Sequence, residues 1–178
     1  MTTLEATPIV SNYSEIIRDV TIGLLVTTEE TRDILIAGII ETFWDDDQSP
    51  GDLALCGVAL LDVRVRDSIL WHMAQLDDEL MLEAYSVLLK AADVVYENDK
   101  NSSYERGHSS PAYTCAGIAA LLLGNYREAR VCIDFVYASD PSYSLAMLVD
   151  MALRANINPD DCRSEIFGGD YETYRYGG

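Results

Sequence analysis

The stretch that decides the fold is Ser110–Tyr143, SPAYTCAGIAALLLGNYREARVCIDFVYASDPSY. It predicts two antiparallel helices joined by a turn. Pro111 favours the start of the first helix, because a proline at the first helical position loses only an amide that has no helical partner. Gly124-Asn125 breaks that helix, and Asp140-Pro141 ends the second one. Gly117 lies inside the first helix, where glycine costs up to about 1 kcal/mol relative to alanine, so we expect another backbone to pass close by.

The same stretch resembles one tetratricopeptide repeat, a helix–turn–helix unit of about 34 residues. The positions that carry the resemblance are Tyr113, Gly117, Gly124-Asn125-Tyr126, Ala129, Ile133 and Asp140-Pro141. An ordinary helical hairpin with a Gly-Asn turn is the alternative, and it predicts the same local structure. One hairpin cannot bury its own apolar face, so the rest of the chain must cover it on both sides.

Apolar residues at helical spacing on both sides of the hairpin predict further helices. We predict one all-α domain, residues 14–166, of about seven or eight helices, with the repeat-like hairpin at 110–143 near its C-terminal end and a covering helix at 143–155. Residues 1–13 are expected to be a loose arm, and residues 167–178 a flexible tail rich in glycine and tyrosine. The β-branched residues at Val20 and Thr21 leave residues 14–26 open between helix and strand.

Two polar stretches interrupt the predicted helices. Asp62–Asp67 alternates between apolar and charged residues, and we predict a connection there. Asn98–Ser109 is the most polar part of the chain and predicts an exposed loop. Between them, the helix from Glu79 to about Glu97 has apolar residues around much of its circumference, so we expect it to be central.

The composition sets the size and the charge of the domain. The chain has 178 residues, which is enough for one domain with a sizeable core. Its 12 Lys and Arg residues stand against 30 Asp and Glu residues, which gives a formal net charge of −18. Such a surface repels nucleic acid and anionic membranes and attracts a basic partner.

The location that we expect is the cytoplasm. No apolar run reaches the roughly 18 residues of a membrane span, and MTTLEATPIV lacks the pattern of a signal peptide. The cysteines are too far apart in sequence for a metal-binding pair, and three of them lie in apolar helical patterns typical of reduced, buried thiols. They are Cys56, Cys115, Cys132 and Cys162.

The sequence offers no constellation for catalysis, a cofactor or a metal ion. His72 and His108 lack the spacing of a zinc site. A base role for His108 would need a nucleophile and a group that orients the base. Asp45–Asp47 could chelate a cation, but a solvated helix end is the simpler interpretation. We therefore predict a protein that is not an enzyme.

Arginine is scarce in this chain, yet two arginines stand together just before a predicted helix. The guanidinium is a planar fork of donors that suits carboxylates. These arginines either pair with nearby acids and fix the connection or anchor an acidic group of a partner. The candidate partner-binding residues are Arg64, Arg66, Asp67, Trp71, Tyr113 and Tyr126.

A wider resemblance covers roughly residues 51–159. Its most specific pieces are Val65-Arg66-Asp67, the Gly124 hairpin, and Asp140-Pro141 leading into Tyr143-Ser144-Leu145. In this order they are similar to the C-terminal part of an actinobacterial family of uncharacterised proteins that is also met in phages. Members of that family are longer, with an additional N-terminal half. The resemblance supports the helical fold and implies no activity.

Two functions of different classes fit these observations. The first is a non-enzymatic module that binds another protein, with a phage-encoded protein acting on a host protein as one form of it. Helical repeats commonly serve as binding surfaces, and this inference is by analogy. The alternative is an acidic decoy that imitates nucleic acid and occupies a nucleic-acid-binding protein. A homodimer is also expected, because a short helical stack can leave an apolar face open.

Overall fold

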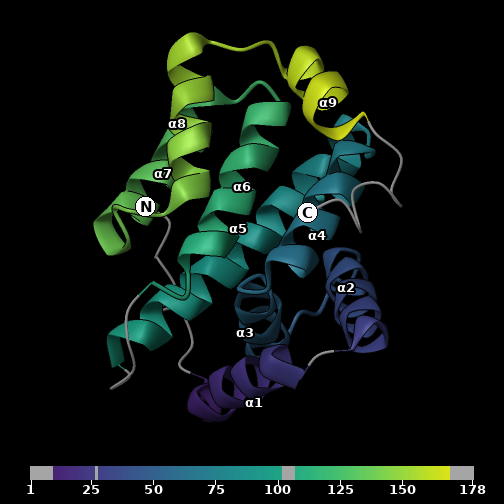
Figure 1. The fold of residues 1–178 in the computed structure, drawn as a ribbon, viewed down its shortest axis with the longest axis vertical. Helices are drawn as coiled ribbons and strands as arrows, with labels where there is room; N and C mark the ends of the chain where they lie inside the picture. The colour runs from purple at the N-terminus through teal and green to yellow at the C-terminus, as the bar shows by residue number, and fades with distance from the viewer. Residues whose placement is uncertain (1–9, 27, 102–106, 169–178) are drawn as a thin grey trace.

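The computed structural model describes residues 10–26, 28–101 and 107–168, and this part of the chain is all-helical (Figure 1). The all-α prediction is confirmed, with nine helices in the described residues. Residues 14–26, for which a strand was the alternative, are helical. None of the described helices is long and apolar enough to cross a membrane. The helices are α1 (Tyr13–Val26), α2 (Glu29–Phe43), α3 (Pro50–Ala59), α4 (Val63–Ala74), α5 (Asp78–Asn101), α6 (Ser110–Leu122), α7 (Tyr126–Ser139), α8 (Ser144–Ala155) and α9 (Pro159–Phe167).

The centre of the fold is α6, in which all 13 residues are buried. The sequence explains this burial, because the stretch from Ser109 to Tyr126 carries no charged side chain. Helix α6 packs against α5 and α7, and also contacts α4, α8 and α9 (Figure 1). The long helix α5 in turn packs against α3, so it links the hairpin to the N-terminal helices. Helices α1, α2 and α3 lie at one end of the long axis, and α8 and α9 lie toward the other.

The hairpin predicted from the sequence is formed by α6 and α7. A Cβ added to Gly117 would lie 3.3 Å from Cys132 Cβ and 3.4 Å from Ile133 Cδ1, so the glycine permits the two helices to approach closely. Gly124 has a φ of 72°, a left-handed conformation that glycine adopts without strain. Asn125 caps α7 by accepting a hydrogen bond from an amide of its first turn. The relation of this hairpin to the tetratricopeptide repeat stays a prediction.

Helix α4 begins earlier than predicted, and the connection expected at Asp62–Asp67 is wrong. Asp62 is the N-cap residue, and its Oδ1 accepts hydrogen bonds from the amides of Arg64 (2.7 Å) and Val65 (3.2 Å). The other oxygen of the same carboxylate pairs with Nε of Arg32 at 3.0 Å. The alternating pattern therefore belongs to the first turn of a capped helix, in which Val65 is buried.

The exposed loop predicted at Asn98–Ser109 is also wrong at both of its ends. Helix α5 continues to Asn101, and Asn98, Asp99 and Ser109 are buried. Asn98 Oδ1 accepts a hydrogen bond from the amide of Val10 (2.9 Å), and Asp99 Oδ1 accepts one from the hydroxyl of Tyr13 (2.7 Å). The polar side chains satisfy donors that come from the start of the chain. Residues 102–106 lie outside the described residues.

The ends of the domain are packed more closely than the sequence indicated. Val10 and Tyr13, assigned to a loose arm, are buried, and so is Phe167 at the end of α9. The remainder of the predicted arm, residues 1–9, and residues 169–178 of the predicted tail lie outside the described residues.

Candidate functional site

Tyr113, one of the predicted partner-binding residues, is a core residue in this structure. The side chain is 1% exposed, and its hydroxyl donates to Asp93 Oδ1 at 2.6 Å. The ring stacks on that of Phe135, with the ring centroids 5.1 Å apart. Burial raises the pKa of Tyr113, and it also raises the pKa of Asp93 against the opposing effect of the tyrosine hydrogen bond. Its burial follows from the packing of α6 between α5 and α7, which the residue type alone does not indicate.

Arg66 and Asp67 form an internal pair. Nε and Nη2 of Arg66 donate to Asp67 Oδ1 at 2.9 and 2.7 Å, and Nη1 donates to the hydroxyl of Tyr143 at 3.0 Å. Of the two interpretations of these arginines, this geometry matches the internal one, because the guanidinium holds the residue that precedes α8. Arg64, by contrast, is exposed on the first turn of α4.

The other two predicted residues also make contacts within the fold. Trp71 is half-buried, with its ring edge-on to that of His72 and the centroids 5.2 Å apart. The hydroxyl of Tyr126 donates to the carbonyl oxygen of Ile157 at 2.9 Å, which ties the start of α7 to the end of α8. The six predicted residues are spread over α4, α6 and α7 and do not line one common site.

His108 pairs with a carboxylate at the end of α5. Nδ1 of His108 lies 3.0 Å from Asp99 Oδ1. The hydroxyl of Ser109 is buried and has no hydrogen-bond partner among the described residues, and that of Ser110 lies 3.3 Å from the hydroxyl of Ser139. Within residues 107–168, neither serine is hydrogen-bonded to His108. In the described part of the chain, no group of three His, Cys, Asp or Glu side chains is arranged to hold a metal ion.

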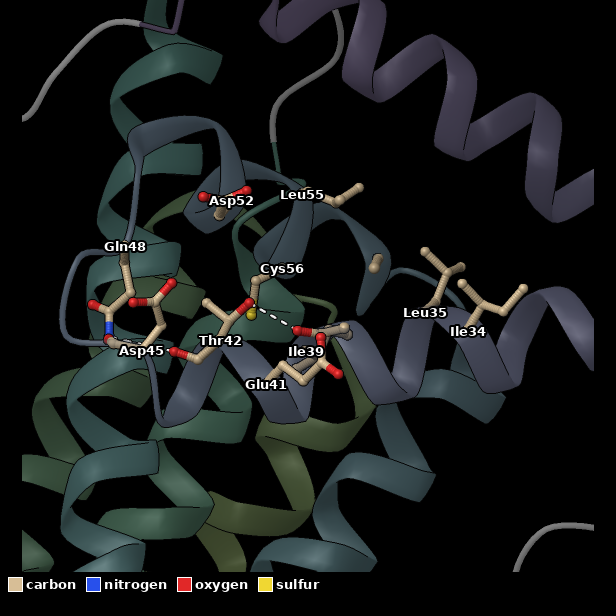
Figure 2. A pocket seen from close by; sticks show the side chains of 12 residues that line it. Ile34, Leu35, Ile39, Glu41, Thr42, Asp45, Gln48, Asp52, Leu55 and Cys56 are labelled. Carbon is tan, nitrogen blue, oxygen red and sulfur yellow. Dashed lines mark hydrogen bonds between the residues drawn. The ribbon is translucent and has the colours of Figure 1, made fainter.

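A groove between α2 and α3 is the site that the sequence patterns did not reveal, and Figure 2 shows it from close by. Its volume is about 410 Å³. Its floor is made by buried apolar side chains, and its walls by two exposed ones, Ile34 (66% exposed) and Leu55 (41% exposed). The floor residues are Ile39, Cys56 and Ala59. Together with the floor, these two side chains give the groove a continuous apolar lining.

Gly38 lies in the middle of α2 and lines this groove. No heavy atom lies within 4 Å of the position that a Cβ would occupy there. A glycine inside a helix costs about 0.5–1 kcal/mol relative to alanine. At Gly117 the close approach of the neighbouring helix explains why the residue is a glycine. At Gly38 no described part of the fold comes close enough to require one. The open space above it leaves the backbone of α2 accessible from the groove.

Every charged residue that lines the groove is acidic, namely Glu41, Asp45 and Asp52. Residues 29–62, which include both helices of the groove, contain nine acidic side chains and one basic one, Arg32, while Lys90 of α5 donates to the groove-lining Gln48 Oε1 at 3.1 Å. That arginine is already paired with Asp62. Apolar surface bounded by carboxylates favours a ligand that is both apolar and positively charged.

The polar contacts at the rim keep the groove in shape. Asp52 and Ser49 form a capping box at the start of α3, with the Asp52 amide donating to Ser49 Oγ at 3.2 Å. The hydroxyl of Thr42 donates to the carbonyl oxygen of Gly38 at 2.8 Å (Figure 2). Burial raises the pKa of Cys56 to about 12, so this thiol stays protonated and unreactive at neutral pH.

One signal in the sequence could have found the groove. The run Ile34-Leu35-Ile36, followed by Ile39-Ile40, wraps farther around the helix than a single core-facing stripe requires. Such a helix buries one side and leaves apolar residues on another. The exposed side of α2 is the wall of the groove.

A family model described as a domain of unknown function, DUF4192, matches residues 35–160, and the chain therefore belongs to this family. The match runs from the groove-lining part of α2 to the start of α9. No curated protein and no solved structure matches the chain.

Proposed function

We propose that this member of the DUF4192 family is a non-enzymatic protein-binding module, and that its α2–α3 groove holds a basic amphipathic helix of another protein. The observation that carries the proposal is the apolar, acid-rimmed groove that is open above Gly38. Helix-in-groove binding is a common mode of recognition between proteins, with apolar anchors at positions i, i+3 or i+4, and i+7 of the bound helix.

The dimensions of the groove suit such a segment. Its α2 wall runs from Ile34 to Thr42, which is about 12 Å at 1.5 Å per residue and matches two turns of a bound helix. A bound helix would place its apolar side on Ile39 and Leu55 and pass over Gly38, where no side chain blocks it. Lysine or arginine on its other faces would lie near Glu41, Asp45 and Asp52.

One further feature of the chain supports binding of a protein over catalysis. The hairpin of α6 and α7 resembles a tetratricopeptide repeat, and stacks of such repeats present binding surfaces. This argument is an analogy of fold and concerns function only indirectly. The wider resemblance suggests relatives in actinobacteria and in their phages. For a phage-encoded protein, the partner would be a protein of the host. We expect the encounter in the cytoplasm, where buried thiols such as Cys56 remain reduced.

The proposal can be tested with a defined probe. The probe is a fluorescein-labelled peptide of 16 residues, with leucines at i, i+4, i+7 and i+11 and lysines and alanines elsewhere. This leucine spacing places the apolar anchors on one side of the helix, as in known helix-in-groove complexes. Fluorescence anisotropy should show saturable binding to the wild-type protein. A peptide of the same composition with its leucines distributed around the helix, and one with glutamate in place of lysine, should bind at least about tenfold more weakly.

Variants of the protein locate the site. Gly38→Leu fills the space above α2 and Ile34→Glu removes an apolar wall, so each should weaken binding by at least about tenfold. Leu82→Glu is the matched control, since Leu82 is 57% exposed on α5 and does not line the groove, and it should leave binding unchanged. Circular dichroism establishes that each variant is folded.

The acidic decoy predicts a different result. It would bind its target through charge alone, so Gly38→Leu would have no effect and Glu41→Lys with Asp45→Lys would abolish binding. Equal binding of the two lysine-containing peptides would likewise refute docking of a helix in the groove.

A further inference from the structure

The charged side chains that line the α2–α3 groove lie toward one of its ends. Figure 2 shows Asp45 and Gln48 at that end, where α2 stops and the chain turns toward α3. Asp52, in the first turn of α3, lines the groove on the same side. Ile34 and Leu35 form the other end, and the described residues that line the groove there are uncharged. The groove therefore has an acidic end and an apolar end.

The helix dipole of α2 strengthens this polarity. The helix ends at Phe43 and has no basic residue in its last turn, so the partial negative charge at its C-terminus adds to the charge of Asp45. At the other terminus, Glu29 and Glu30 lie in the first turn and offset the partial positive charge of the helix. These two residues do not line the groove. The negative charge that a ligand in the groove can reach is therefore concentrated at the acidic end.

Contacts within the fold use only part of this negative charge. The carboxylate of Asp52 accepts a hydrogen bond from a backbone amide in the capping box of α3. Lys90 of α5 donates to Gln48 Oε1 at 3.1 Å and brings one positive charge to the acidic end. The side chains of Glu41 and Asp45 are exposed, and neither forms an ion pair with another described residue. Their charges are available to a ligand.

The acidic end opens into a second hollow, which lies between the end of α2 and α5 and shares Asp45 and Gln48 with the groove. Its volume is about 240 Å³. Trp44, which is 41% exposed, lines this hollow together with Asp46 and Glu83. A segment that lies in the groove can therefore extend beyond Asp45 into the hollow. An ammonium or guanidinium group there would meet carboxylates and an indole ring, and both attract cations.

We infer, on the basis of the proposed function, that the partner helix carries its basic residues together at one end. Its apolar turns lie over Ile34 and Leu55, and its basic turn lies over Asp45 and reaches toward Trp44. A helix with evenly spread lysines would place some of them at the apolar end, where no described carboxylate lines the groove. Charge complementarity of this kind selects among partners that share the same apolar anchors.

Two labelled peptides of the same composition test this arrangement at about 0.1 M NaCl. Both carry the leucines of the probe described above. In the clustered peptide the lysines lie together at the C-terminal end, where they also suit the helix dipole, and in the spread peptide they are distributed along the polar faces. Fluorescence anisotropy should show that the clustered peptide binds the wild type at least about threefold more tightly. The ratio should approach one near about 0.5 M NaCl, because salt screens exposed charges.

Two double variants of the protein locate the basic end. Glu41→Gln with Asp45→Asn removes two charges from the acidic end and should weaken binding of the clustered peptide at least about threefold. Glu29→Gln with Glu30→Gln is the matched control, because it removes two charges at the start of α2, about 20 Å from the end of that helix. This distance exceeds the Debye length of about 10 Å, so the control should bind the peptide as the wild type does. Circular dichroism establishes that both variants are folded.

The possible results distinguish the basic end from binding in the groove itself. Equal affinities of the two peptides for the wild type at about 0.1 M NaCl, or equal losses in the two double variants, would overturn the basic end and leave binding in the groove intact. If neither peptide binds the wild type, the proposed function fails, and the basic end fails with it.

Discussion

Two glycines in neighbouring helices lie in opposite surroundings, and alanine at each should change the stability in opposite directions. Gly38 in α2 has no heavy atom within 4 Å of the place that an added Cβ would take. At Gly57 in α3, the same added atom would lie 2.6 Å from Val95 Cγ2 and 3.1 Å from the carbonyl oxygen of Ala91. One site is open to the groove, and the other is where α3 packs against α5.

The magnitudes follow from these distances. Gly38→Ala removes backbone freedom of the unfolded chain without a clash, so it should stabilise the fold by about 0.5–1 kcal/mol. Gly57→Ala also reduces the backbone freedom of the unfolded chain, but overpacking of a close helix contact costs about 1–3 kcal/mol. Val95 can shift its methyl group, whereas the Ala91 carbonyl belongs to the helix backbone and cannot. The net change at Gly57 should therefore be a loss of about 1–2 kcal/mol.

Urea denaturation followed by circular dichroism measures both effects at 25 °C. Thermal unfolding should agree, with shifts of about 2–4 °C per kcal/mol in a chain of this size. A loss of stability in Gly38→Ala would contradict the open surroundings of that glycine, because it would mean that another part of the folded chain occupies the space above α2. A gain in Gly57→Ala would mean that α3 and α5 are farther apart than in this structure.

Three further predictions concern the hairpin and α8. Gly117→Leu should destabilise the fold by about 1–3 kcal/mol through overpacking of α6 against α7, and an unchanged urea midpoint would count against that contact. Tyr113→Phe leaves the half-buried carboxylate of Asp93 without its hydrogen-bond donor and should lower the free energy of unfolding by about 1–3 kcal/mol. Tyr126→Phe removes a more exposed hydroxyl and should lower it by less than about 1 kcal/mol. Equal losses of stability in urea denaturation would contradict this difference. Burial alone would raise the pKa of Asp150, but hydrogen bonds from Arg154 and Arg130 hold this pKa below its ordinary value. The stabilising effect of Asp150 is present above the ordinary carboxylate pKa and is lost as the pH falls through the lowered value. Asp150→Asn should therefore be less stable than the wild type at pH 6, and the difference in free energy of unfolding should narrow toward pH 3. A difference that stays constant with pH would mean that the carboxylate is not ionised in the fold.

The helical class and many helix ends could be predicted from the sequence, because they depend on interactions between residues close in the chain. Pro111 near the start of α6, the Gly124-Asn125 turn and the stop at Asp140-Pro141 act through local backbone geometry. The helix expected to be central was the one from Glu79 to about Glu97, whereas the helix that is buried along its whole length is α6. The errors at Asp62–Asp67 and Asn98–Ser109 arose where polar side chains serve the fold itself.

The candidate site depends on contacts that local patterns do not contain. Tyr113 suits a binding surface by residue type, but the arrival of Asp93 and Phe135 from α5 and α7 makes it a core residue. Asn98 and Asp99 are buried because their partners come from the start of the chain, more than 80 residues away.

Local sequence was sufficient to establish that this chain forms helices, where the hairpin turns, and that the chain is strongly acidic. Which side of each helix is covered depended on how the helices pack. Gly38, Gly57 and Gly117 are all glycines inside helices, yet one is open, one is tightly packed and one marks a close crossing. Helix formation is governed by hydrogen bonds and caps within a few residues, whereas the pairing of helix faces is governed by packing between segments distant in sequence. The groove of α2 and α3 is a product of that pairing.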